Sequence, residues 1–343
     1  MNKTRIESVD LLKGFCILFV ILYHCQYDVL PPQLNHLCRN IALSGFFFAA
    51  GFFFPAEQSF WKFALHKFNR LIIPYLFFNL LWLGVVAITG WDPHFELTLA
   101  YLADFFLDPA NLPTWFLPPL FFLHLLYFGI NRMPHRIRLI AIIIITVAGW
   151  VIAYNYSDSH SYFWHEQMRL HLPIAMISLP LIHAGHLASK NGLLTWNPRV
   201  PIAIAVFIVA FAISYLCSAK DVNLYAIVFD NSPIPFYIAA YTGIAWVWML
   251  SCKLHKAPFI TFFGRNSLTA LCVHFPIIFI AERAGITATL PLFATSVAAT
   301  TLLIVFFTRY CPFATAQRDL LVYDKSRKTP FSLNLHTKTV KKN

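Results

Sequence analysis

The chain has 343 residues, of which 58% are hydrophobic and 12% charged, whereas soluble domains average roughly 45–50% and 25%. This composition excludes an ordinary soluble protein and predicts a multi-pass protein of the cytoplasmic cell membrane, whose many aromatic residues suit lipid-facing and interfacial surfaces. The formal net charge of +11 does not indicate nucleic-acid binding, because the basic residues are dispersed over short loops and not gathered on one face.

Apolar stretches close to the twenty or so residues that cross a bilayer recur along the chain. They lie near residues 11–30, 40–55, 70–90, 113–130, 138–156, 170–188, 199–217, 233–252, 266–283 and 290–310. This pattern predicts an all-α integral membrane protein with about ten transmembrane helices, in one domain over residues 1–312. Residues 313–343 form a basic cytoplasmic tail, expected to be solvated or to touch anionic membrane lipids.

The distribution of basic residues predicts the orientation of the chain. With these spans, twenty-two of the twenty-six Lys and Arg residues fall on the side of the two termini. The four on the other side are Arg39, Arg169, Lys220 and Arg283. Because the cytoplasmic loops of membrane proteins carry the excess of Lys and Arg, both termini are predicted to be cytoplasmic.

Lys13 and His24 lie inside the first predicted span. A charge near the middle of a bilayer costs several kcal/mol, so an ionisable residue there indicates a function. Eleven residues at about 100° each return to nearly the same helix face, and at about 1.5 Å each they rise roughly 16 Å. One face therefore presents a cation and, about three turns further, a base. This arrangement suits a long molecule with an anionic head and a reactive tail.

Five segments, in the right order, resemble the membrane-bound acyltransferase 3 family. Its first helix carries Arg or Lys, ten residues and then His, as Lys13 and His24 do. Ser44-Gly-Phe-Phe-Phe-Ala-Ala-Gly51 resembles its Phe-rich second helix, and Lys67-Phe-Asn-Arg70-Leu-Ile-Ile-Pro74 resembles the basic start of its third helix. Thr114-Trp-Phe-Leu117 is similar to its Trp-Phe-Leu segment. Phe263-Gly-Arg-Asn-Ser-Leu-Thr-Ala-Leu-Cys-Val-His274 resembles a late helix of the branch that includes fucose and other sugar O-acetylases.

Three details depart from the family pattern. Lys13 replaces the commoner Arg, which keeps the charge but loses bidentate contact with phosphate. The Ser-Gly order at Ser44 is displaced, and the Trp115 segment lacks the acidic residue of the lipopolysaccharide-modifying branch. The last departure bears on the acceptor more than on the reaction.

The resemblance implies an O-acyltransferase. Such an enzyme moves an acyl group, usually acetyl, from cytoplasmic acyl-CoA to a hydroxyl of a cell-envelope or exported glycan or its lipid-linked precursor. A sugar hydroxyl is a poor nucleophile, so His24 is expected to take its proton as general base. Lys13, Lys67 and Arg70 are expected to bind the anionic end of acyl-CoA, the donor substrate.

Three residues of the ninth span complete the expected site. Asn266 and Ser267 are expected to donate hydrogen bonds to the developing oxyanion or to coenzyme phosphates. His274 is expected to assist with the acceptor. The seven scattered cysteines show no pairing or metal-ligand spacing and no zinc pattern is present, so we expect no metal and no tightly bound cofactor.

Each of these side chains has a structural alternative: His24 as an interfacial histidine, Lys67 and Arg70 as positive-inside anchors, and Asn266, Ser267 and His274 in interhelical hydrogen bonds. Lys13 at i, i+3 from Asp10 suits an ion pair at the interface. Trp115 favours the outer aromatic belt. His183 and His186 lack a third ligand, so they are more consistent with packing than with a metal site.

Two other classes of protein remain open for the whole chain. A secondary transporter of a sugar, lipid or organic ion suits the intramembrane Lys and His, but the expected internal repeats are not evident. A non-catalytic scaffold leaves the spacing of Lys13 and His24 unexplained. The small residues Gly45 and Gly51 suit helix contacts within the chain or a homodimer seam.

Overall fold

The computed structural model of the protein describes residues 6–25, 31–55, 59–90, 95, 98–107, 112–158, 169–220, 222–224, 228–229, 233–254, 257–323 and 331–333. The two termini, predicted to be cytoplasmic, and most of the basic tail lie outside these residues.

Helices account for most of the described chain. Their bounds are α1 Glu7–His24, α2 Pro32–Gly51, α3 Phe60–Lys67, the π-helical η1 Phe68–Ile72, α4 Ile73–Thr89, α5 Leu99–Leu107, the 3₁₀-helical η2 Leu112–Phe116, α6 Leu117–Ile130, α7 His135–Asp158, η3 Arg169–His171, α9 Leu172–Ile177, α10 Leu179–Lys190, η4 Leu193–Thr195, α11 Val200–Cys217, α12 Pro233–Lys253, α13 Pro258–Arg265, α14 Ser267–Arg283 and α15 Thr289–Tyr310. Two short antiparallel strand pairs, β1 Val222–Asn223 with β2 Val228–Phe229 and β3 Leu321–Tyr323 with β4 Phe331–Leu333, add to the predicted all-α fold.

Every predicted span contains helix, but the helices differ in how well they suit lipid. Among the described residues, seven helices are long and apolar enough to cross a membrane, and the bent pair α13 and α14 makes an eighth. α1 and α2 have 18 and 20 residues but carry more polar side chains, among them the buried Asp10 and Asn40. These two helices bring polar groups into the interior of the bundle, where protein surrounds them.

Several predicted spans have different bounds in the structure, the first being a helix over Glu7–His24 and the second one over Pro32–Gly51. The third begins at Phe60, ten residues early, because α3, η1 and α4 continue as one helix that Ser59 caps by accepting from the amide of Lys62. The sixth is divided at Ser178 into α9 and α10. The ninth is preceded by α13, which meets α14 at 92°. The two breaks fall at polar residues, Ser178 and Asn266, which follow the ends of α9 and α13.

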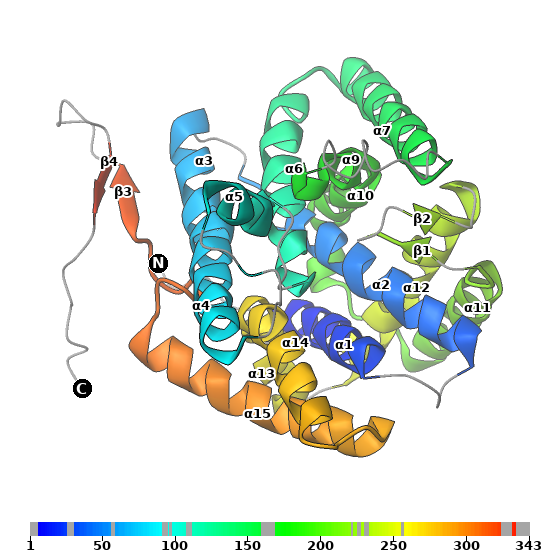
Figure 1. Ribbon diagram of the computed structural model, residues 1–343. Helices are drawn as coiled ribbons and strands as arrows, with labels where there is room; N and C mark the ends of the chain where they lie inside the picture. Colours follow the sequence, from blue (N-terminus) through cyan, green and yellow to red (C-terminus); the bar gives the residue numbers. More distant parts are fainter. Residues whose placement is uncertain are drawn as a thin grey trace, which may run out of the picture.

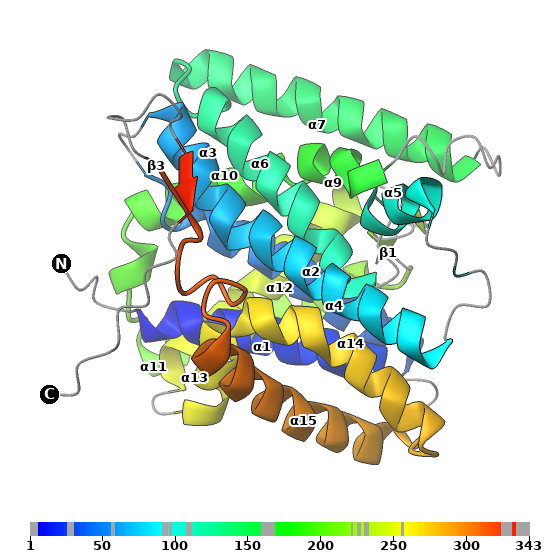
Figure 2. The same cartoon turned by 60° about the vertical axis from the view of Figure 1, so that its left-hand side comes forward.

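α1 lies inside the bundle, in contact with α2, α12, α13 and α14 (Figure 1, Figure 2). Its approach to α13 depends on two glycines. The backbone carbonyl of Ile260 occupies the space that a side chain at Gly14 would need, and the carbonyl of Asp10 does the same at Gly264. This close crossing holds the first turns of α1 against the end of α13.

We expect Gly264→Ala to destabilise the protein, because the new methyl group would overlap the backbone of α1 and overpacking typically costs about 1–3 kcal/mol. The melting temperature in detergent, followed by tryptophan fluorescence, measures the effect. Gly84→Ala on α4 is the matched control, since no atom lies within 4 Å of the added methyl group. Equal melting temperatures for the two variants would contradict this account of the crossing.

The other two small residues also serve contacts within the chain. A side chain at Gly45 would overlap Cys16 on α1, and one at Gly51 would overlap the backbone of α10 at Ile182. These glycines therefore explain how α2 packs between two neighbouring helices. The homodimer remains a prediction, and these two glycines do not support it because their contacts lie within the chain.

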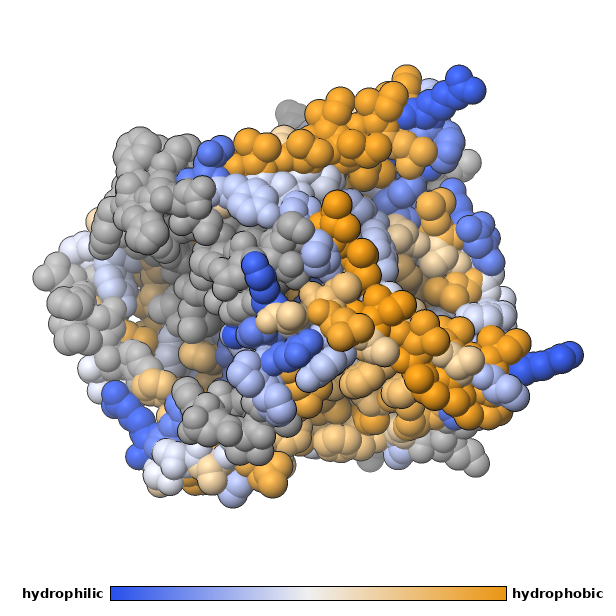
Figure 3. Space-filling model, turned by 90° about the vertical axis from the view of Figure 1, so that its right-hand side faces the viewer, coloured by the Kyte–Doolittle hydropathy of each residue, from blue (hydrophilic) through white to orange (hydrophobic). Residues whose placement is uncertain are grey.

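Large apolar side chains point outwards on α7, α11 and α15, including Ile143, Ile204 and Leu302, each more than half exposed. Figure 3 shows apolar side chains over a broad part of one face. Soluble monomers rarely expose apolar surface on this scale. This surface is the one expected to meet lipid.

Candidate active site

The described residues surround a cavity of about 570 Å³ to which four cationic side chains contribute. Lys13 comes from α1, Lys67 from the last position of α3, Arg70 from η1, and Arg265 from the end of α13. We name this space the cationic cavity. It brings the three predicted coenzyme-binding cations together and adds a fourth.

The buried carboxylate of Asp10 orders two of these cations. Its Oδ1 lies 3.3 Å from Lys13 Nζ and its Oδ2 lies 3.2 Å from Arg265 Nε. The alternative prediction, a pair between Lys13 and Asp10, is therefore confirmed, yet the same lysine also lines the cavity. One carboxylate against two cations leaves this wall with a net positive charge.

Lys67 and Arg70 lie at the single π-helical turn of the third span. Such turns are rare and often occur at functional sites. The ammonium of Lys67 lies 5.5 Å from the centre of the Phe63 ring, within range of a cation–π contact. Arg70 Nε lies 3.3 Å from the carboxylate of Asp319.

The segment after α15 closes one side of the cationic cavity. Thr315, Ala316 and Gln317 line it, although residues from 313 onward were assigned to the tail. Asn69 holds this segment: its Oδ1 accepts from the amides of Leu320 and Leu321 at 2.9 and 2.8 Å. The start of the predicted tail thus packs against η1.

Ser267 and Asn266 take different places at the bend between α13 and α14. Ser267 lines the cationic cavity and begins α14, whose first amides lack partners within the helix and favour an anion. The Asn266 amide donates to the carbonyl of Phe262 at 2.9 Å. Asn266 therefore braces the bend and does not line either cavity among the described residues.

His124 on α6 lines the cationic cavity but was not predicted. Its Nδ1 lies 2.7 Å from the carbonyl oxygen of Leu120; because a carbonyl only accepts, Nδ1 carries a proton and Nε2 of the neutral ring keeps its lone pair. A histidine inside an apolar span is the signal that would have found it.

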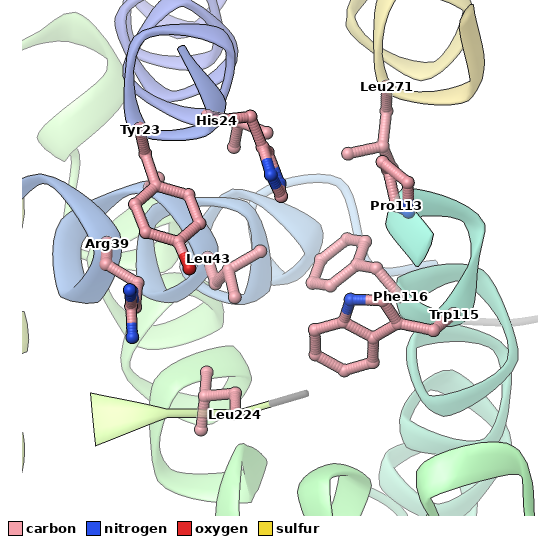
Figure 4. A pocket seen from close by; sticks show the side chains of 11 residues that line it. Tyr23, His24, Arg39, Leu43, Pro113, Trp115, Phe116, Leu224 and Leu271 are labelled. Atoms are coloured by element: carbon pink, nitrogen blue, oxygen red, sulfur yellow. The ribbon is translucent and has the colours of Figure 1, made fainter. Parts of the chain in front are cut away.

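A second cavity, of about 280 Å³, lies towards the other end of α1. We name it the His24 cavity. Figure 4 shows the His24 imidazole pointing into the space that Trp115 and Phe116 also face, with Tyr23 and Arg39 nearby. Lys13 and His24 thus line two different cavities.

His274 lies behind His24. The two imidazole rings are 5.3 Å apart between centres, and Phe275 lies at the same distance from His24. His274 is fully buried and contacts the carbonyl of Ala270 through Nδ1 at 2.9 Å. It is not among the described residues that line the His24 cavity.

Trp115 is buried, which corrects its assignment to the outer aromatic belt. Its indole lines the His24 cavity and lies 4.9 Å from the ring of His171. The neighbouring Thr114 donates to Asn79 Oδ1 at 3.1 Å, which ties η2 to α4. The aromatic belt was inferred from the position of Trp115 near a span end, but η2 turns inwards there.

The second histidine pair, His183 and His186 on α10, is buried. The hydroxyl of Tyr127 lies 2.9 Å from His183 Nδ1, and the ring of Phe54 packs 5.9 Å from that of His186. No cluster of three or more potential metal ligands occurs among the described residues. These contacts agree with the packing interpretation.

The fold and the two cavities define a class: a polytopic membrane protein with a cationic cavity at one end of α1 and a half-buried imidazole in a second cavity towards the other end. The comparison with protein families gives the particular family. The acyltransferase 3 family, described as an acyltransferase domain, matches residues 6–310, so the chain belongs to this family of membrane acyltransferases. No curated protein and no solved structure matches the chain at a significant level.

Proposed function

We propose that the protein is a membrane O-acyltransferase of the cytoplasmic membrane that moves an acyl group, acetyl in the simplest case, from acyl-CoA to a glycan hydroxyl. The observation that carries this proposal is the placement of Lys13 and His24 in adjoining cavities along one helix. The cations of the cationic cavity bind the phosphates of the coenzyme, and the thioester lies near the imidazole of His24. The proposed reaction uses no tightly bound cofactor.

The cationic cavity faces the cytoplasm in this proposal. Its four cations belong to the twenty-two basic residues on the predicted cytoplasmic side, whereas Arg39 of the His24 cavity belongs to the other side. Ser267 and the first amides of α14 add hydrogen-bond donors for a phosphate. The acyl group therefore travels away from the cytoplasm to reach the base.

His24 acts as general base in the reaction. The acceptor hydroxyl attacks the thioester carbonyl and gives its proton to the imidazole. The new C–O bond forms as the C–S bond breaks, and the imidazolium returns the proton to the coenzyme thiolate. His274 positions the His24 ring through their contact, and Trp115 offers an apolar ring face on which a sugar can stack.

The test uses the purified full chain in detergent. Acetyl-CoA is added, its binding is measured by calorimetry, and the free thiol released with time is measured with a thiol reagent. Saturable binding with thiol release supports the proposal. A monodisperse, cooperatively melting protein that binds no acyl-CoA would contradict it.

We expect Asp319→Asn to tighten acyl-CoA binding. The carboxylate of Asp319 lies 3.3 Å from Arg70 Nε and competes with the phosphates for that guanidinium. Exposed ion pairs are worth up to about 1 kcal/mol, so we expect the dissociation constant to fall up to about fivefold in calorimetry. The neutral amide keeps the shape of the side chain. Unchanged or weaker binding would show that Asp319 does not compete for Arg70.

A further inference from the structure

Side chains on α2, η2 and α6 form a layer between the two cavities. On α2, Leu43 lines the His24 cavity and Phe46, one turn on, lines the cationic cavity. Where η2 continues into α6, Phe116 lines the His24 cavity and Leu120 lines the cationic cavity. Residues three or four apart on a helix are separated by only about 5 Å along its axis. Among the described residues, none lines both cavities.

Two phenylalanine rings meet in this layer. The ring centres of Phe46 and Phe116 are 5.9 Å apart, with their planes at 56°. Phe116 also packs against Phe47 at 4.8 Å. Phe47 and Phe116 are 0% and 2% exposed, whereas Phe46 is half-buried and borders the larger cavity. Of the three rings, Phe46 is the one with room to turn.

We propose that the Phe46–Phe116 pair determines which acyl chain the enzyme accepts and selects short acyl donors. This inference rests on the proposed function, in which phosphates are held in one cavity and the base lies in the other. The acyl group is the end of the donor, so it passes the ring pair before the thioester does. Each methylene group added to the acyl chain must then fit, together with the acceptor, into the His24 cavity of about 280 Å³.

Phe46→Ala removes the ring that can turn and joins the two cavities. We expect the ratio of kcat/KM for hexanoyl-CoA to that for acetyl-CoA to rise at least about tenfold, since methylene discrimination in apolar pockets is of this order or larger. Phe46→Leu, a milder change that keeps an apolar side chain, is expected to shift the ratio in the same direction. Phe46→Trp is expected to slow acetyl transfer while coenzyme A binding remains.

Phe122→Ala is the matched control. Phe122 is half-buried like Phe46 but, two residues after Leu120 on α6, it lies on another face of that helix and lines neither cavity. We expect its ratio to equal that of the wild type. An unchanged ratio in both Phe46→Ala and Phe46→Leu, with normal coenzyme A binding, would overturn the selection of acyl length and leave the proposed function standing. A wild type that turns over no acyl-CoA would overturn both.

Discussion

His24→Gln is expected to reduce acyl transfer by about 10²- to 10⁴-fold, the usual contribution of a positioned general base. Glutamine keeps a polar side chain of similar reach but cannot take the proton of the acceptor hydroxyl. The imidazole points into the His24 cavity, away from the cations that hold the phosphates. The dissociation constant of acyl-CoA should therefore remain within about twofold of the wild type.

The measurement is steady-state transfer, with acyl-CoA binding determined on the same preparation. His135→Gln at the exposed start of α7 controls for the loss of a histidine as such. A His24→Gln variant with normal turnover would exclude His24 as the base. In that case His124, with its Nε2 lone pair and its place in the cationic cavity, would be the next histidine to replace.

Lys67→Met is expected to produce the opposite kinetic result. It removes one cation from the cavity but keeps an unbranched apolar stem, so binding of acyl-CoA should weaken about tenfold or more, as expected for the loss of a charge-assisted hydrogen bond. Turnover at saturating acyl-CoA should change little. The affinity of the variant should also depend less on ionic strength, because salt screens the attraction that has been removed.

Calorimetry at low and moderate salt measures both effects. Lys62→Met is the control, since Lys62 lies exposed near the start of the same helix, α3, and does not line the cationic cavity. Lys67 is preferable to Arg70, whose removal would also release Asp319 from its ion pair. If Lys67→Met bound acyl-CoA as tightly as Lys62→Met, the phosphates would have to be held elsewhere.

The positions of the helices and the shared face of α1 were predictable from the sequence. Each of the ten apolar stretches contains helix, since burial in lipid or protein demands such stretches whatever their packing partners. Lys13 and His24 lie on one helix, so helical geometry alone sets their separation. Lys67 and Arg70 are three positions apart in one helix, so they too lie close together.

Contacts between distant parts of the chain could not be predicted from local patterns. Arg265 reaches Asp10 across 255 positions, and Asn69 holds the backbone of Leu321 across 252. The sequence favoured an interfacial place for Trp115, because it contained no information on where η2 turns. The bend between α13 and α14 at Asn266 was likewise not predictable from local patterns.

By itself, the sequence determined that this is a helical membrane protein of the acyltransferase 3 family with a cation and an imidazole on one helix face. Only the tertiary structure decided that these two residues serve separate cavities, that His274 lies behind His24, and that Phe46 and Phe116 meet between the cavities. The physical reason is that hydropathy and helical period act along one element, whereas a cavity is formed by the packing of several helices. Close crossings such as that of Gly14 and Gly264 set that packing.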